Sequence, residues 1–149
     1  MKRHKKWLGL LMVPLMAGCG AGKADGGAMG VSASVTGVEW RVESVTAGGD
    51  TLGAPAGGSP RLTIGTDGSA SGDLGCNRFS ARVSVHGDRI TFGALRTTKM
   101  ACDPARTRFE RALTRVLDRQ TVTGTVEHGK LTLTSGHGDL VRLGRGAPE

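Results

Sequence analysis

Short stretches in which apolar and polar residues alternate recur along the chain, and this pattern constrains the fold more than any other feature. In the first stretch, Val38, Trp40 and Val42 alternate with charged residues, as in a β-strand that has one face in water. Glycine-containing turns separate the later stretches, which is typical of antiparallel hairpins. We expect further strands at residues 62–64, 79–85, 90–92, 122–126, 131–133 and 141–143.

One segment has the helical period instead. Its apolar residues recur every three or four positions, at Ala105, Phe109, Ala112, Leu113, Val116 and Leu117. Asp103 is suited to cap this helix and Pro104 to begin it. Arg106 is placed to pair with Glu110 one turn later. The order of strands, one helix and strands again predicts an α+β, mostly β fold, in which an antiparallel sheet or open barrel is covered by one α-helix.

Residues 1–19 resemble the export signal of a bacterial lipoprotein. A basic start is followed by an apolar run, residues 7–16, which is too short to span a bilayer as a helix. The run ends in residues 15–19, which are similar to the lipobox whose cysteine receives diacylglycerol, with Met16 where leucine is usual. We therefore expect a lipid on Cys19. The alternative is an ordinary secretory signal with a cysteine near its end.

These features predict the organisation of the whole chain. We expect a signal peptide at residues 1–18, Cys19 with a flexible Gly/Ala/Ser tether at 19–36, one folded domain at 37–145 and a tail at 146–149. The domain is then exported and bound to the membrane through its lipid, on the extracytoplasmic side. Within the domain, residues 46–60 are longer than a routine connection. They are either a binding loop or a surface insertion of small residues.

The positive charge of the chain does not indicate nucleic-acid binding. The net charge is +7, and it falls to +3 when the signal leaves with Lys2, Arg3, Lys5 and Lys6. Only Trp40 and the three phenylalanines then remain as aromatic residues. Since the chain has no platform on which bases could stack, we expect no nucleic-acid partner.

Two local motifs are distinctive. Residues 75–80 read Gly-Cys-Asn-Arg-Phe-Ser, and residues 97–102 read Thr-Thr-Lys-Met-Ala-Cys directly before the predicted helix. Together they resemble the META domain family, also called HslJ-like, over residues 38–145. The resemblance implies a compact envelope domain that is linked to heat shock and antibiotic tolerance and has no established enzymatic activity. The motif residues are Gly75, Cys76, Asn77, Phe79, Thr98, Met100 and Cys102.

Cys76 and Cys102 form the pair that is left once Cys19 carries a lipid. The resemblance and the oxidising export compartment favour a disulfide between them, which would hold the helix against the sheet. Two buried reduced cysteines are the alternative. Asn77 is expected to have a structural role, supporting a turn through bonds from its side chain to the backbone.

No residue pattern indicates a catalytic, metal or cofactor site. The histidines are scattered over turns rather than clustered at ligand spacing, at His86, His128 and His137. The serines of residues 68–72 lie in a predicted glycine-rich turn without a base beside them. The acids that could form a pair also lie in predicted turns, at Asp67, Asp73, Asp88 and Glu127.

The predicted helix has a basic face, made by Arg108, Arg111, Arg115 and Arg119. Such a face is usually solvated, and contact with anionic lipid head groups is the alternative.

We therefore expect a non-enzymatic envelope lipoprotein. Its domain would bind an envelope protein or a cell-wall component, or support the envelope under stress. Two other functions stay open. One is an exported hydrolase whose site is assembled only in three dimensions, and the other is an inhibitor or small-ligand binder that uses residues 46–60.

Overall fold

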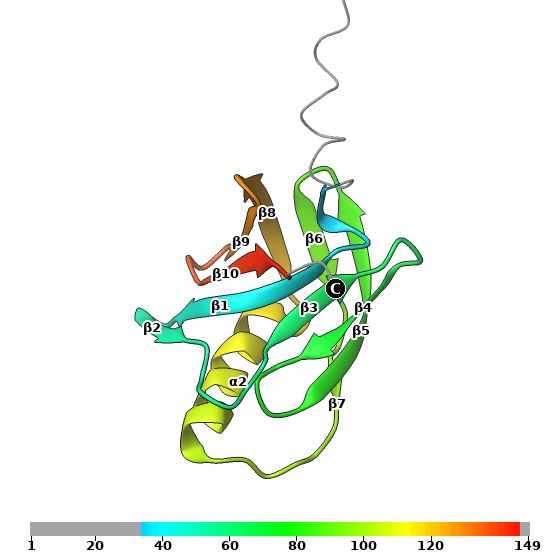
Figure 1. The fold of residues 1–149 in the computed structure, drawn as a ribbon. Coiled ribbons are helices and arrows are strands. Elements are labelled where there is room, and N and C mark those ends of the chain that lie inside the picture. The colour runs from blue at the N-terminus through cyan, green and yellow to red at the C-terminus, as the bar shows by residue number, and fades with distance from the viewer. Residues whose placement is uncertain (1–33, 147–149) are drawn as a thin grey trace, which may run out of the picture.

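The computed structural model describes residues 34–146, which form ten β-strands and the helix α2 (Figure 1). In chain order the elements are β1 (Glu39–Ala47), β2 (Asp50–Gly53), β3 (Arg61–Ile64), β4 (Ser69–Asp73), β5 (Arg78–His86), β6 (Arg89–Phe92), β7 (Arg96–Thr97), α2 (Pro104–Leu117), β8 (Thr121–Glu127), β9 (Lys130–Ser135) and β10 (Leu140–Arg145).

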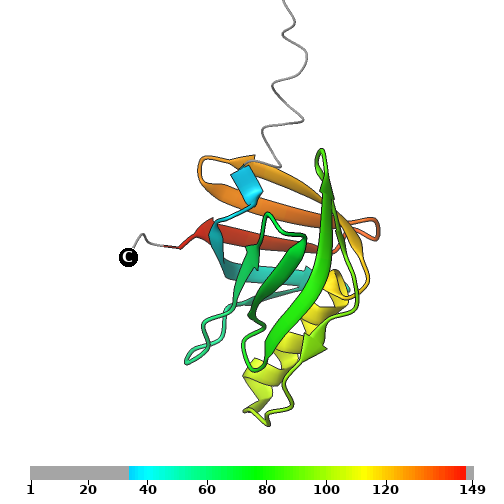
Figure 2. The same ribbon diagram turned by 90° about the vertical axis from the view of Figure 1, so that its right-hand side faces the viewer.

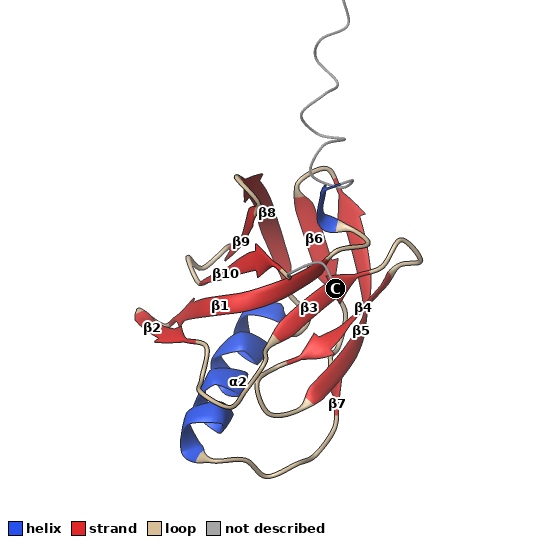
Figure 3. Ribbon diagram, viewed as in Figure 1, coloured by secondary structure: helices blue, strands red, loops and turns tan. Residues whose placement is uncertain are grey.

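Eight of the strands form a closed antiparallel barrel in the order β1, β3, β4, β5, β6, β8, β9, β10. The ring closes because β10 returns to β1, where Val42 lies opposite Leu143 and Val45 opposite Val141. The short strands β2 and β7 pair with β1 and β5. The mostly β fold with one helix is confirmed (Figure 3). The expected antiparallel sheet is also confirmed, but the barrel is closed rather than open, because pairing of β10 with β1 leaves the ring no unpaired edge.

Three strands escaped the alternation pattern, namely the two-residue strand β7, β4 and β2. The longest of them is β4. Its one buried apolar side chain is Ala70, set among serines and glycines, so the predicted glycine-rich turn at residues 68–72 was wrong. β4 pairs with β3 on one side and with β5 on the other. Gly72 permits this pairing, since an added Cβ would lie 1.9 Å from the backbone oxygen of Arg61 on β3.

The second missed strand is β2, which lies inside the segment predicted as one long loop at residues 46–60. The first part of this segment is a tight hairpin between β1 and β2. It turns at Gly48 and Gly49, which have positive φ angles of 62° and 88° that favour glycine. Only residues 54–60 form a connection without regular structure. The loop in the structure is therefore about half as long as the predicted loop.

The helix α2 covers one end of the barrel, where it packs against β1, β8 and β10 (Figures 1 and 2). Four residues of its apolar stripe are buried in the core, and Ala112 is partly buried, whereas Ala105 is exposed. Asp103 caps the helix by accepting a hydrogen bond from the Arg106 backbone, and Pro104 begins it, as predicted. The predicted pair of Arg106 and Glu110 was wrong, because the Arg106 side chain donates instead to the Gly75 carbonyl at 2.8 Å.

Residues on both sides of the predicted domain, 37–145, also bond to the barrel. Val35 is fully buried, and its carbonyl accepts a hydrogen bond from the Trp40 indole at 3.0 Å. At the other end, the Gly146 amide donates to the Glu39 carbonyl at 3.0 Å. The predicted signal peptide, Cys19 and most of the predicted tether lie outside the described residues.

Among residues 34–146, no helix combines the length and the apolar character that crossing a bilayer requires.

The turn between β3 and β4 contains an acid whose titration tests the local structure. Asp67 Oδ1 accepts hydrogen bonds from the Ser69 hydroxyl at 2.7 Å and from the Ser69 amide at 3.1 Å. The hydroxyl bond first, and then the amide bond, stabilise the carboxylate and hold the pKa of Asp67 below its ordinary value. This contribution to stability is present above the unfolded-state pKa and is lost as the pH falls through the lowered folded-state pKa.

Replacement of Ser69 by alanine should raise the pKa of Asp67 toward the ordinary aspartate value, because the stronger of the two bonds is removed. An NMR titration of the Asp67 carboxyl carbon measures this change. Equal pKa values in the original and Ser69→Ala proteins would contradict the assignment.

Candidate functional site

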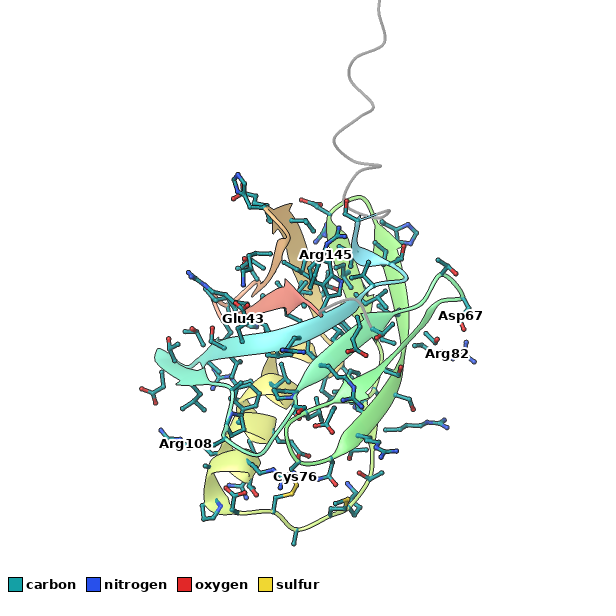
Figure 4. The ribbon with its side chains drawn as sticks, in the orientation of Figure 1. Glu43, Asp67, Cys76, Arg82, Arg108 and Arg145 are labelled. Carbon is teal, nitrogen blue, oxygen red and sulfur yellow. A yellow bond between two sulfur atoms is a disulfide. The ribbon has the colours of Figure 1, made fainter. Side chains whose placement is uncertain are left out.

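The two signature motifs meet beside the start of α2. Residues 75–77 lead into β5, and residues 98–102 form the segment between β7 and α2. A disulfide joins Cys76 to Cys102, which are 26 positions apart in sequence and have Cα atoms 6.0 Å apart. Figure 4 shows Cys76 near the first turns of α2. The bond holds the segment before the helix against the barrel.

Asn77 fixes this segment through its side-chain oxygen. Its Oδ1 accepts hydrogen bonds from the Met100 amide at 2.7 Å and from the Thr98 hydroxyl at 2.9 Å. Its Nδ2 also lies 3.4 Å from the Met100 carbonyl oxygen, to which it donates. The expected structural role of Asn77 is therefore present, but the backbone that it supports is distant in sequence rather than in its own turn.

The other partner of Asn77 is Glu110 on α2. The Asn77 amide Nδ2 donates to both carboxylate oxygens, at 3.0 and 3.1 Å, and the Asn77 backbone amide donates to Oε2 at 3.1 Å. One carboxylate thus accepts hydrogen bonds from both the backbone amide and the side-chain amide of Asn77. The sequence analysis missed this role of Glu110, because helical spacing offered Arg106 as a nearer partner and no local pattern connects positions 77 and 110.

The other two motif residues shape the barrel side of the site. Gly75 has a φ of 103°, and an added Cβ would lie 3.2 Å from the Phe109 ring. Phe79 is 4% exposed and belongs to the core. Of the predicted motif residues, Gly75, Cys76, Asn77, Thr98 and Cys102 therefore position the segment, and Phe79 anchors β5.

Met100 differs from the other motif residues, because its side chain points outward while its backbone is held. Both its amide and its carbonyl bond to Asn77. The side chain is 62% exposed, and within residues 34–146 it is the large apolar side chain that stands out to solvent. Methionine in an exposed position is typical of contact surfaces, since its flexible thioether adapts to different partners.

A cavity of about 380 Å³ lies next to Met100 on one flank of α2. It is lined by Cys76, Asn77, Met100, Thr107, Glu110, Arg111, Thr114 and Arg115. A second cavity, of about 230 Å³, lies on the other flank, between the helix and the β1–β2 hairpin. It is lined by Ala47, Asp50, Leu52, Arg108, Arg111, Ala112 and Arg115. Arg111 and Arg115 line both cavities, so these form one surface that crosses the helix, which we call the α2 surface.

The arginines of the α2 surface differ in their partners. Arg115 donates to the buried carboxylate of Asp139 at 3.2 Å, and the Gly48 amide donates to the same carboxylate at 2.9 Å. Within the described part of the chain, Arg108 and Arg111 have no carboxylate within the 4.0 Å of an ion pair. Of the four arginines predicted to form the basic face, Arg119 lies past the end of α2, Arg115 is paired with Asp139, and Arg108 and Arg111 are open to a ligand.

A third cavity, of about 440 Å³, lies on the barrel wall between β1 and residues 54–61. Glu39 and Arg41 line it, together with the backbone of the connection to β3. Each of the three cavities contains a single carboxylate, and the one beside Met100 is already bonded to Asn77. None of the three therefore holds a carboxylate pair.

The remaining residues considered from sequence stay apart from the α2 surface. His86 and His128 lie at strand ends on hairpin turns, and Ser69 and Ser71 lie in β4. Among residues 34–146, no three histidine, cysteine, aspartate or glutamate side chains gather as metal ligands would.

Comparison with known proteins identifies the family of the chain and structures of similar fold. The family model of the META domain matches residues 33–147. The chain is similar to the NMR structure of a protein from Burkholderia xenovorans, with a TM-score of 0.66 and 20% identity over 99% of this chain and 100% of that chain. A second NMR structure has a TM-score of 0.57 and 20% identity over 74% of this chain and 91% of that chain. No curated protein matches significantly. At these identities the structural likeness concerns the fold alone.

Proposed function

Because the chain belongs to the META domain family, we propose that its domain is a non-enzymatic binding module of the cell envelope, exported as a lipoprotein and anchored through a lipid on Cys19. The module binds its partner through the α2 surface and supports the envelope under stress. The exposed side chain of Met100, held on a braced segment beside two cavities, is the observation that carries this proposal.

The bracing of Met100 favours recognition. A disulfide two positions away and the two backbone bonds to Asn77 restrict the segment before any partner arrives. Binding therefore costs little additional backbone entropy. Burial of the exposed part of a methionine side chain contributes about 1 to 2 kcal/mol. Exposure of the Met100 side chain therefore costs free energy in the free domain, and burial by a partner recovers that free energy.

The chemistry of the cavities supports binding over catalysis. Hydrolysis requires a nucleophile beside a base, or two carboxylates that face one bond. The cavity next to Met100 contains Glu110, whose oxygens are engaged by Asn77, together with threonine hydroxyls and arginines. This set can orient a ligand by hydrogen bonds and charge, and it lacks the second group that acid–base chemistry needs.

Site-specific photo-crosslinking in intact cells tests this function. A photoreactive amino acid at position 100 should give a discrete adduct, because the partner covers Met100. The matched control places the same amino acid at Thr125, an exposed position of β8, where no adduct is expected. The adduct at position 100 should weaken at least about tenfold in a Cys19→Ala background, since release from the membrane lowers the local concentration of the partner. Equal labelling at positions 100 and 125, or an adduct indifferent to Cys19, would contradict the proposal.

A further inference from the structure

We infer that the partner of the α2 surface is an extended acidic segment of a protein, with carboxylates on Arg108 and Arg111 and apolar side chains in the two flanking cavities. This inference rests on the proposed function, because it specifies the chemistry of the partner at the same surface.

The positive charge of the α2 surface is the first reason to expect an acidic partner. Arg108, Arg111 and Arg115 are spaced by three and four positions, so they project from the same side of α2. Asp139 neutralises Arg115, and no described carboxylate lies within ion-pair distance of Arg108 or Arg111. Two unneutralised guanidinium groups one turn apart repel each other slightly in the free protein. Carboxylates relieve this repulsion and accept paired hydrogen bonds from the planar groups.

The apolar lining of the two cavities is the second reason, and it indicates that the partner also carries apolar side chains. On one side of the arginines, Met100 borders the larger cavity. On the other side, Ala47, Leu52 and Ala112 line the smaller cavity beneath the β1–β2 hairpin, where the carboxylate of Asp50 also lies but forms no ion pair with the arginines. A ligand that carries only negative charge would leave both apolar linings in water. A peptide that alternates acids with leucine-like residues covers the arginines and both cavities together.

The shape of the surface distinguishes a peptide from a membrane. The two cavities share Arg111 and Arg115, and a crossing peptide can place a side chain in each, whereas a phosphate head group would leave their apolar linings uncovered. The described chain begins at the end of the barrel that lies away from the start of α2 (Figures 1 and 2).

The experiment measures binding of a short fluorescent peptide of glutamates and leucines to the intact chain in detergent, by fluorescence anisotropy. The double variant Arg108→Glu/Arg111→Glu should weaken this binding at least about tenfold, because two charge-assisted contacts become repulsive. The matched control is Arg82→Glu/Arg89→Glu, which changes two exposed arginines of β5 and β6. Figure 4 shows Arg82 and Arg108 on opposite sides of the domain. The control should bind within about twofold of the original.

Three further measurements test the interpretation of this result. The neutral variant Arg108→Gln/Arg111→Gln should show an intermediate loss, and a circular dichroism melt of each variant verifies that the fold is intact. A peptide of glutamates alone should bind several times more weakly than the mixed peptide, because it leaves the cavities empty.

Other outcomes overturn the inference. These are absence of peptide binding, an equal loss in both arginine pairs, or binding of phosphatidylglycerol vesicles in place of the peptide. If the photo-crosslink at position 100 persists in any of these cases, the proposed function stands and only the acidic peptide is excluded. If that crosslink is also absent, both proposals fail.

Discussion

Replacement of Asn77 by aspartate is expected to destabilise the domain by about 3 kcal/mol at neutral pH. The side-chain nitrogen that is lost lies 3.0 and 3.1 Å from the two oxygens of Glu110. In Asn77→Asp a carboxylate oxygen takes its place, so two donated hydrogen bonds become a repulsion between like charges. The bonds that Oδ1 accepts from Met100 and Thr98 can persist. The loss of stability therefore measures the contact between α2 and the residue directly before β5.

Urea unfolding followed by circular dichroism measures this loss. The second substitution Glu110→Gln should recover most of it, because a glutamine amide can donate to the new aspartate. The stability difference between Asn77→Asp and the original protein should also narrow as the pH falls, since a proton on one carboxyl group restores a donor. An Asn77→Asp protein of unchanged stability, or a double variant no more stable than the single one, would show that the Asn77–Glu110 contact does not hold the helix.

Removal of the disulfide, in Cys76→Ser/Cys102→Ser, should lower the free energy of unfolding by about 3.5 kcal/mol. The bond closes a loop between positions that are 26 residues apart, and its loss restores the freedom of that loop in the unfolded chain. In a domain of this size such a loss is a large part of the total stability. Because Asn77 still bonds to Met100, the variant should fold, with faster amide exchange in residues 98–102.

Thermal unfolding and hydrogen exchange test this second prediction, with Cys19→Ser as the control that leaves the pair intact. The original protein treated with a thiol reductant should behave like the double variant. Alkylation of both Cys76 and Cys102 without reductant would refute the disulfide itself. Reduction should also weaken binding at the α2 surface, because the Met100 segment loses its covalent support.

Local sequence patterns predicted much of the fold. The helix was found because Asp103, Pro104 and an apolar stripe act within a few residues of one another. The longer strands were found because alternate side chains face the core. β4 was missed because it has only Ala70 to bury, and its pairing depends on Gly72 fitting against β3. β2 was missed because a strand of four residues in a glycine-rich segment has no readable period.

The sequence by itself determined most of the strand pattern, the single long helix and the motif residues that gather beside α2. Only the tertiary structure decided that the barrel closes through β1 and β10, that Glu110 bonds to Asn77 instead of Arg106, and that Met100 and two free arginines share one surface. The physical reason is distance along the chain. Periodicity and capping depend on neighbours within one or two turns, whereas these contacts join residues that meet only when the barrel has formed.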